Sequence, residues 1–138
     1  MKTKTVKKSE VKRVWQLLDA KNQVLGRLSS KISVLLMGKN KPNYVSYLDM
    51  GDYVVIVNAA QIKVTGRKAE QKKYYRHSGH PGGFRQRIFS EQLALDPRKI
   101  IRHAVAGMLP KNKLQDPRLA RLKIFNDEKH PYEDKIKN

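Results

Sequence analysis

Five consecutive residues, Tyr53 to Val57, constrain the fold more than any other part of the sequence. All five favour β-structure, and no polar residue alternates with them. A strand with one face in water alternates between apolar and polar residues, whereas a strand covered on both faces does not. The run therefore predicts a buried central strand in a parallel sheet.

Two amphipathic helices are expected around this strand. After a short expected strand at 15–18, apolar residues recur at helical spacing from Leu25 to Leu36, and Gly38 is a natural C-terminal stop. A second helix is expected to begin at Asp96-Pro97, with Asp as the cap and Pro in the first helical position. Pro110 should end it. This order of elements is typical of an α/β protein.

The remaining segments carry weaker signals. Residues 74–76 suggest another strand, and the three glycines and one proline within 77–83 predict a shaped loop. Ser90 is a possible helix start. Asp116-Pro117 repeats the cap signal and predicts a short helix, while residues 122–125 fit either that helix or a last strand.

Strands that alternate with amphipathic helices predict an α/β fold with a mainly parallel sheet covered on both sides. With 138 residues the chain has the size of one domain. We expect a flexible basic N-terminal arm at 1–13, a single globular domain at 14–126 and a loose polar C-terminal tail at 127–138.

The charge of the chain points to a polyanionic partner. There are 30 Lys and Arg against 12 Asp and Glu, which gives a formal net charge of +18. So much like charge opposes folding unless a partner neutralises it. Nucleic acid is favoured over an anionic membrane or an acidic protein. No apolar run has the length of about 20 residues that a membrane span needs, and no cysteine is available for disulfides, thiolate ligands or nucleophiles.

The positive charge is concentrated in two segments. Residues 63–87 and 98–123 each contain eight Lys or Arg and one acid, whereas 48–62 contains no basic residue. Within the first segment, aromatic rings and cations alternate around a glycine loop, a mixture that suits RNA phosphates, riboses and unstacked bases. One of Tyr74 and Tyr75 should face the core, because adjacent strand residues point to opposite sides.

No catalytic or metal site is predicted. The glycine loop lacks both the Walker pattern and the dinucleotide G-x-G-x-x-G pattern, and no serine lies in a G-x-S-x-G elbow. His77 and His80 have metal-ligand spacing, but His103 and His130 are distant in sequence and a closed zinc site needs four ligands. Asp49 and Asp52 are interpreted as turn and cap residues around Gly51. We therefore expect no enzyme activity and no cofactor.

An ordered set of short motifs resembles one known family, the bacterial form of large-subunit ribosomal protein L13. The resemblance extends from about Trp15 to Pro131. Its motifs, in chain order, are Asp19-Ala20 with Leu25-Gly26-Arg27-Leu28, Gly38-Lys39 with Lys41-Pro42, Gly51-Asp52-Tyr53-Val54, Asn58-Ala59 with Thr65-Gly66, Tyr74-Tyr75-Arg76-His77-Ser78-Gly79 with Pro81-Gly82-Gly83, Gly107-Met108-Leu109-Pro110-Lys111-Asn112-Lys113-Leu114, and His130-Pro131.

This resemblance implies a three-layer α/β/α domain with a small, mainly parallel four-stranded sheet. It implies a structural protein of the large ribosomal subunit that binds ribosomal RNA, supports early subunit assembly and catalyses no reaction. The residues expected to contact RNA are Lys39, Lys41, Arg67, Lys68, Lys72, Lys73, Arg76, His77, Ser78, Gly79, His80, Gly82, Gly83, Arg85, Lys111, Lys113, Arg118 and Arg121.

The expected partners are large-subunit ribosomal RNA and neighbouring ribosomal proteins, with messenger RNA as a further candidate and no membrane. The expected location is the cytoplasm, within the ribosome. Two alternatives remain open. One is an RNA- or nucleotide-modifying enzyme on an α/β fold, which a saturable small-molecule ligand would reveal. The other is a regulator that binds messenger RNA or a protein outside the ribosome, which would not sediment with ribosomal particles.

Overall fold

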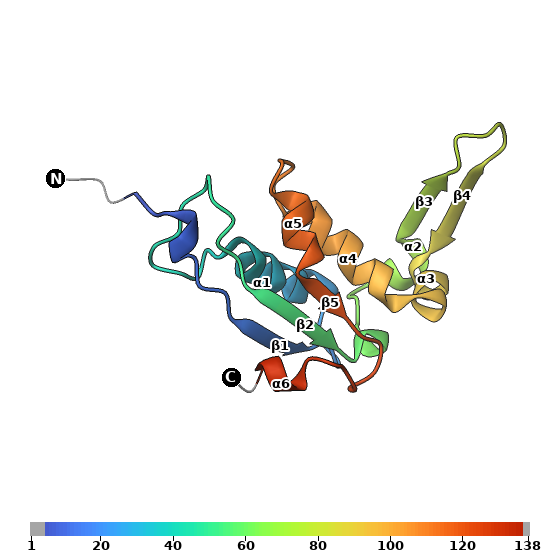
Figure 1. Ribbon diagram of the computed structural model, residues 1–138. Helices are drawn as coiled ribbons and strands as arrows, with labels where there is room; N and C mark the ends of the chain where they lie inside the picture. Colours follow the sequence, from blue (N-terminus) through green and yellow to red (C-terminus); the bar gives the residue numbers. More distant parts are fainter. Residues whose placement is uncertain (1–4, 137–138) are drawn as a thin grey trace.

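A computed structural model describes residues 5–136 of the chain. Its main sheet contains β1 (Trp15–Asp19), β2 (Tyr53–Val57) and β5 (Leu122–Ile124) in the order β1-β2-β5, and both pairings are parallel (Figure 1). Val54, Val55 and Ile56 are fully buried. The predicted central parallel strand is therefore confirmed, because β2 has a neighbour along each edge and is covered on both faces.

The long helices pack on one face of this sheet. α1 (Leu25–Met37) and α4 (Pro97–Met108) contact each other closely and share one buried cluster with Val54, Ile56 and Leu122. Alternate strand residues point to opposite faces, so these three side chains mark the helix-covered face. As predicted, α1 ends at Gly38, which adopts the left-handed conformation with φ 80°.

The opposite face is covered by the C-terminal segment. Tyr132 stacks on Trp15 with ring centroids 4.9 Å apart, and Trp15 stacks in turn on Tyr53 at 4.3 Å. The short helix α6 (Glu133–Ile136) follows and contacts β1. The polar C-terminal segment thus contacts the sheet through Tyr132 and α6. Residues 137 and 138 lie outside the described residues.

The described part of the N-terminal arm is also held against the domain. A 3-10 turn, η1 (Lys8–Glu10), is followed by Arg13, whose guanidinium donates to the carbonyls of Asp49 and Gly51 at 3.1 and 3.3 Å. Val6 is buried. The described part of the predicted arm is therefore held against the domain at Val6 and at Arg13. Its first four residues lie outside the described part of the chain.

A second, separate sheet is a two-stranded hairpin. β3 (Lys73–His77) and β4 (Phe84–Ile88) pair antiparallel, with Arg76 opposite Arg85, and project from the body of the domain (Figure 1). The strand at 74–76 was predicted, but β4 was not. The predicted four-stranded sheet is not confirmed: the described residues form three parallel strands, one isolated parallel bridge between Val24 and Lys63, and this hairpin.

Short helices connect these units. They are η2 (Ala59–Gln61), α2 (Lys68–Gln71), α3 (Phe89–Leu95) and α5 (Gln115–Ala120). Asp96 caps α4 as predicted, by accepting from the Arg98 N–H at 3.2 Å. In α5 the same signal was misread, because the helix begins at Gln115 and Asp116 lies in its first turn rather than at its cap. α3 begins at Phe89, one residue before the predicted start at Ser90.

Gly51 allows a close approach between β2 and α1. A Cβ built on Gly51 would lie 1.7 Å from the carbonyl oxygen of Leu36, where no atom fits. We expect Gly51→Ala to lower the free energy of unfolding by about 3 kcal/mol, because the backbone must move apart. Urea denaturation followed by Trp15 fluorescence measures this. In α4, Gly107→Ala meets no atom within 4 Å and is the control. A Gly51→Ala protein as stable as this control would contradict the steric argument.

Candidate nucleic-acid interface

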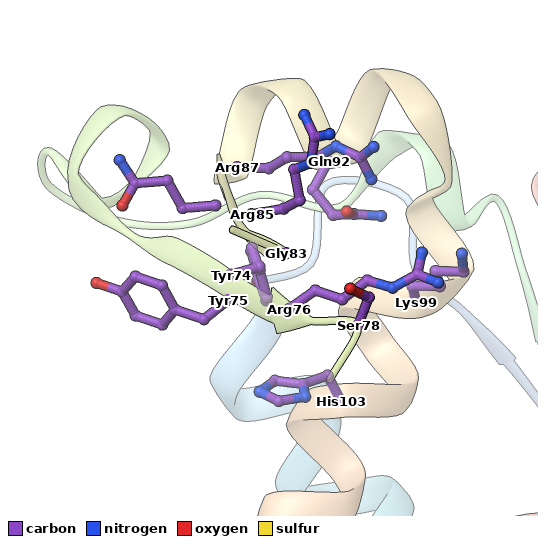
Figure 2. Close-up of a pocket in the computed structure, with 11 residues that line it drawn as sticks. Tyr74, Tyr75, Arg76, Ser78, Gly83, Arg85, Arg87, Gln92, Lys99 and His103 are labelled. Atoms are coloured by element: carbon purple, nitrogen blue, oxygen red, sulfur yellow. The ribbon is translucent and has the colours of Figure 1, made fainter. Parts of the chain in front are cut away.

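The inner face of the hairpin gathers arginines. In the antiparallel register Tyr74 lies opposite Arg87 and Arg76 lies opposite Arg85. Directly paired residues share a face, so these four side chains point to the same side, towards α3 and α4. Figure 2 shows Arg76, Arg85 and Arg87 on this side of the hairpin and the Tyr75 ring pointing away from it.

These arginines have no compensating acid. Residues 72–89 contain neither Asp nor Glu, and no ion pair among residues 5–136 involves Arg76, Arg85 or Arg87. Like charges directly opposite each other in a sheet are destabilising. The Arg76–Arg85 pair therefore raises the positive potential of this face without stabilising the free protein. Such a site suits an anion, and a guanidinium fork suits the two oxygens of a phosphate.

A hollow of about 600 Å³ lies between this face and the helices. The hairpin contributes Arg76, Arg85 and Arg87 to its lining, while α3 contributes Gln92 and α4 contributes Lys99 and His103 (Figure 2). Cations from the hairpin and from α4, which are separate in sequence, thus converge on one cavity beside the amide of Gln92. No carboxylate lines it, so the cavity is electrostatically suited to bind an anion.

Tyr74 forms an aromatic wall of the hollow. Its ring is half-buried against the core and meets the ring of His103 edge-on, with centroids 5.7 Å apart. Burial raises the pKa of the Tyr74 hydroxyl, which has no hydrogen-bond partner among residues 5–136. The prediction that one of the two tyrosines faces the core is confirmed, since Tyr75 is 65% exposed.

The loop at the tip of the hairpin is held by its own polar groups. The Gly79 N–H donates to Nδ1 of His77 at 2.9 Å, and the Ser78 N–H donates to the Gly83 carbonyl at 3.3 Å. Gly83 is required here, because a Cβ would lie 2.1 Å from the Ser78 hydroxyl. His77 therefore orders the loop backbone. Among residues 5–136 no group of three or more His, Asp or Glu is arranged to hold a metal ion.

The other predicted RNA contacts lie at four locations. The basic residues of and around α2, at the base of the hairpin, are exposed and extend its positive surface: Arg67, Lys68, Lys72 and Lys73. Lys39 is exposed in the loop after α1, and Lys111 and Lys113 are exposed in the loop after α4. At the tip of the hairpin, His80 and Gly82 are also exposed. These positions remain predictions.

Three of the predicted RNA contacts, Lys41, Arg118 and Arg121, have cations that form ion pairs inside the protein. Arg118 and Arg121 are 1% and 6% exposed, and both face the carboxylate of Asp49. The ammonium group of Lys41 lies 2.7 Å from the carboxylate of Asp52, which is itself buried. These three residues therefore support the fold, and their contact with RNA stays a prediction.

The comparison with known families agrees with the earlier resemblance. The family model described as "Ribosomal protein L13" matches residues 13–131. The chain belongs to the ribosomal protein L13 family. The match covers the three-stranded sheet, the hairpin and both long helices, so the interface described above lies within the family domain.

Curated L13 relatives are similar over almost the whole chain. A protein of Roseiflexus castenholzii named "Large ribosomal subunit protein uL13" is 52% identical over 132 residues, which cover 96% of this chain and 90% of the relative. Proteins of the same name from Dehalococcoides mccartyi strain 195 and Thermobifida fusca are 50% and 46% identical, cover 96% of this chain, and are themselves covered to 92% and 89%. No helix within residues 5–136 could cross a bilayer.

Asp49 is the centre of an ion network that supports this L13 domain. Arg121 donates to its carboxylate at 2.6 Å, and Arg13 and Arg118 each lie 3.7 Å from it. Burial raises the pKa of Asp49, but the hydrogen bond and charge of Arg121 and the charges of Arg13 and Arg118 outweigh burial and lower it overall. The interpretation of Asp49 and Asp52 as turn residues missed the three ion pairs of Asp49 and the ion pair of Asp52 with Lys41.

Sequence reasoning also missed residues of the interface. Arg87, Lys99 and His103 line the hollow, and Phe84 is exposed at the start of β4. A signal for β4 existed in Phe84-Arg85-Gln86-Arg87-Ile88, where two of the three polar residues are arginines at a spacing of two. No comparable signal pointed to Lys99 or His103, because only the tertiary fold brings α4 beside the hairpin.

Proposed function

We propose that this L13 protein is a structural constituent of the large subunit of cytoplasmic ribosomes. In this role it binds large-subunit ribosomal RNA, contacts neighbouring ribosomal proteins, supports early subunit assembly and catalyses no reaction. The observation that carries the proposal is the acid-free inner face of the hairpin, where Arg76, Arg85 and Arg87 meet Lys99 and His103 around one hollow.

The geometry of the hairpin supports RNA over a smaller anion. The hairpin projects from the domain (Figure 1), so it can enter a groove or junction that the body of the protein cannot. The exposed cations around α2 extend the positive surface beyond the hollow. Several phosphates in series can neutralise such a surface and release their counterions on binding. A single small anion would leave most of these charges unpaired.

The hollow is suited to binding rather than to reaction chemistry. General acid–base catalysis needs a proton donor and acceptor with suitable pKa values close to the substrate. Here the polar lining is dominated by guanidinium and ammonium groups, and its described residues include no carboxylate. Fixed cations of this kind position phosphates by their charge. The arrangement therefore favours a scaffold for folded RNA over an RNA-modifying enzyme.

Sedimentation tests the proposal directly. A tagged copy of the full chain is expressed in a bacterium, and the extract is separated on a sucrose gradient in high salt. We expect the protein to remain with large-subunit particles, because many phosphate contacts act together. Purified protein should also bind large-subunit ribosomal RNA more tightly than an equal mass of messenger RNA. A protein that stays at the top of the gradient and prefers messenger RNA would overturn the proposal and favour the regulatory alternative.

A further inference from the structure

The outer face of the hairpin carries a pair of exposed aromatic rings. Tyr75 and Phe84 are 65% and 56% exposed, and their rings stack with centroids 5.7 Å apart and planes 24° apart. In the register Tyr75 pairs with Gln86 and His77 pairs with Phe84. Tyr75 and Phe84 are thus diagonal neighbours on the face opposite the arginines.

Exposed rings of this size are unfavourable in the free protein. Apolar surface left in water lacks the stabilisation that a partner would give by covering it. The two rings are also already aligned, and aromatic side chains have few rotamers to lose when a flat group stacks on them. An ordered, exposed ring pair is therefore prepared for a flat ligand.

The surrounding charge decides which flat ligand fits. Lys73 and His77 lie on the same face as the ring pair, and no acid occurs between residues 72 and 89. An RNA base arrives attached to phosphates, which the arginines on the inner face of the same two strands can bind. An apolar segment of a protein brings no such charge. Charge complementarity thus favours RNA.

We propose that Tyr75 and Phe84 form a platform on which one unpaired RNA base stacks, while Arg76 and Arg85, on the opposite face of the hairpin, bind phosphates elsewhere along the same RNA. This inference rests on the proposed RNA-binding function and adds that the hairpin recognises an unpaired nucleotide in addition to the charged backbone. Unstacked bases are commonly held on aromatic side chains. Tyr74 does not serve in this way, because its ring is half-buried and already packed edge-on against His103.

The test uses three synthetic RNA hairpins that differ at one position. One is fully paired, one has a single bulged 2-aminopurine nucleotide, and one has an abasic bulge. Wild-type protein should bind the bulged base about 10-fold more tightly than the abasic RNA. Its binding should also change the fluorescence of the 2-aminopurine, because that signal reports stacking of the base.

Variants assign this preference to the platform. The double variant Tyr75→Leu, Phe84→Leu should lose the preference and the fluorescence change, yet bind fully paired RNA as wild type does. Tyr75→Phe should keep both, because the ring remains. Tyr47 is 59% exposed outside the hairpin, so Tyr47→Leu is the control and should behave like wild type. Far-UV circular dichroism checks that each variant is folded.

The outcomes separate this inference from the function on which it rests. If the double variant keeps the preference for the bulged base, or if it loses affinity equally for all three RNAs, the platform is overturned. If Arg76→Ala with Arg85→Ala then still weakens binding to paired RNA, the RNA-binding function stands without the platform. If neither double variant changes binding to any of the three RNAs, both proposals fail.

Discussion

Asp49→Ala is expected to lower the free energy of unfolding by about 3 to 5 kcal/mol, because it leaves buried cations without their carboxylate. Arg118 and Arg121 are 1% and 6% exposed, so neither guanidinium can turn into water without opening the packing around it. Arg121 would retain its bonds to the carbonyls of Leu36 and Asp52. Those neutral acceptors do not offset two neighbouring positive charges. Urea denaturation of the purified protein measures the loss.

A matched control separates the network from the general effect of removing an acid. Asp116 is exposed and belongs to none of the ion pairs of the described residues. Asp116→Ala changes the net charge by the same amount as Asp49→Ala, and we expect it to change stability by less than about 1 kcal/mol. Equal, small effects of the two substitutions would show that Asp49 does not compensate the buried arginines.

The acid limb of the stability curve gives a second readout of the same network. The pKa of Asp49 in the folded protein lies below its usual value of about 3.8. Protons therefore bind more tightly to the unfolded chain, and the stabilisation from this group is complete above the usual pKa. It is lost as the pH falls from about 3.8 through the lower pKa of the folded protein. Asp49→Asn should lack this component of acid unfolding.

Arg76→Ala together with Arg85→Ala is expected to weaken binding to large-subunit ribosomal RNA and to flatten its dependence on salt. If each guanidinium neutralises one phosphate, the slope of log affinity against log salt should become less steep by about two. The fold should remain intact. The free energy of unfolding should stay the same or rise slightly, because a like-charge pair between β3 and β4 is removed. Filter binding at several salt concentrations, beside urea denaturation, measures both quantities.

Lys21→Ala with Lys31→Ala removes the same total charge from exposed positions outside the hairpin. This control variant should bind RNA almost as wild type does, because neither lysine lines the hollow. Equal losses in the two double variants would mean that net charge, and not the hairpin, determines affinity. An unchanged salt slope in the arginine variant would remove Arg76 and Arg85 from the interface.

Local chemistry was sufficient to predict the framework of the fold. Tyr53 to Val57 identified the buried central strand, because a run without alternation has no face to present to water. Gly38 and Asp96-Pro97 identified helix ends, since a left-handed residue after a helix favours the absence of a Cβ and a capped first turn depends on the Asp side chain. The L13 motifs indicated the family, and the net charge indicated a polyanionic partner.

Only the tertiary structure decided which cations are free. Arg121 and Asp49 are 72 residues apart. The sequence around Arg118 and Arg121 therefore does not show that both arginines pair with a carboxylate. β4 was missed because its first four residues are exposed, so no alternation of apolar and polar residues marks the strand. The aromatic and cationic faces likewise exist only through the register of β3 and β4. Sequence fixes how much charge the chain carries, whereas burial and strand pairing determine where that charge meets a ligand.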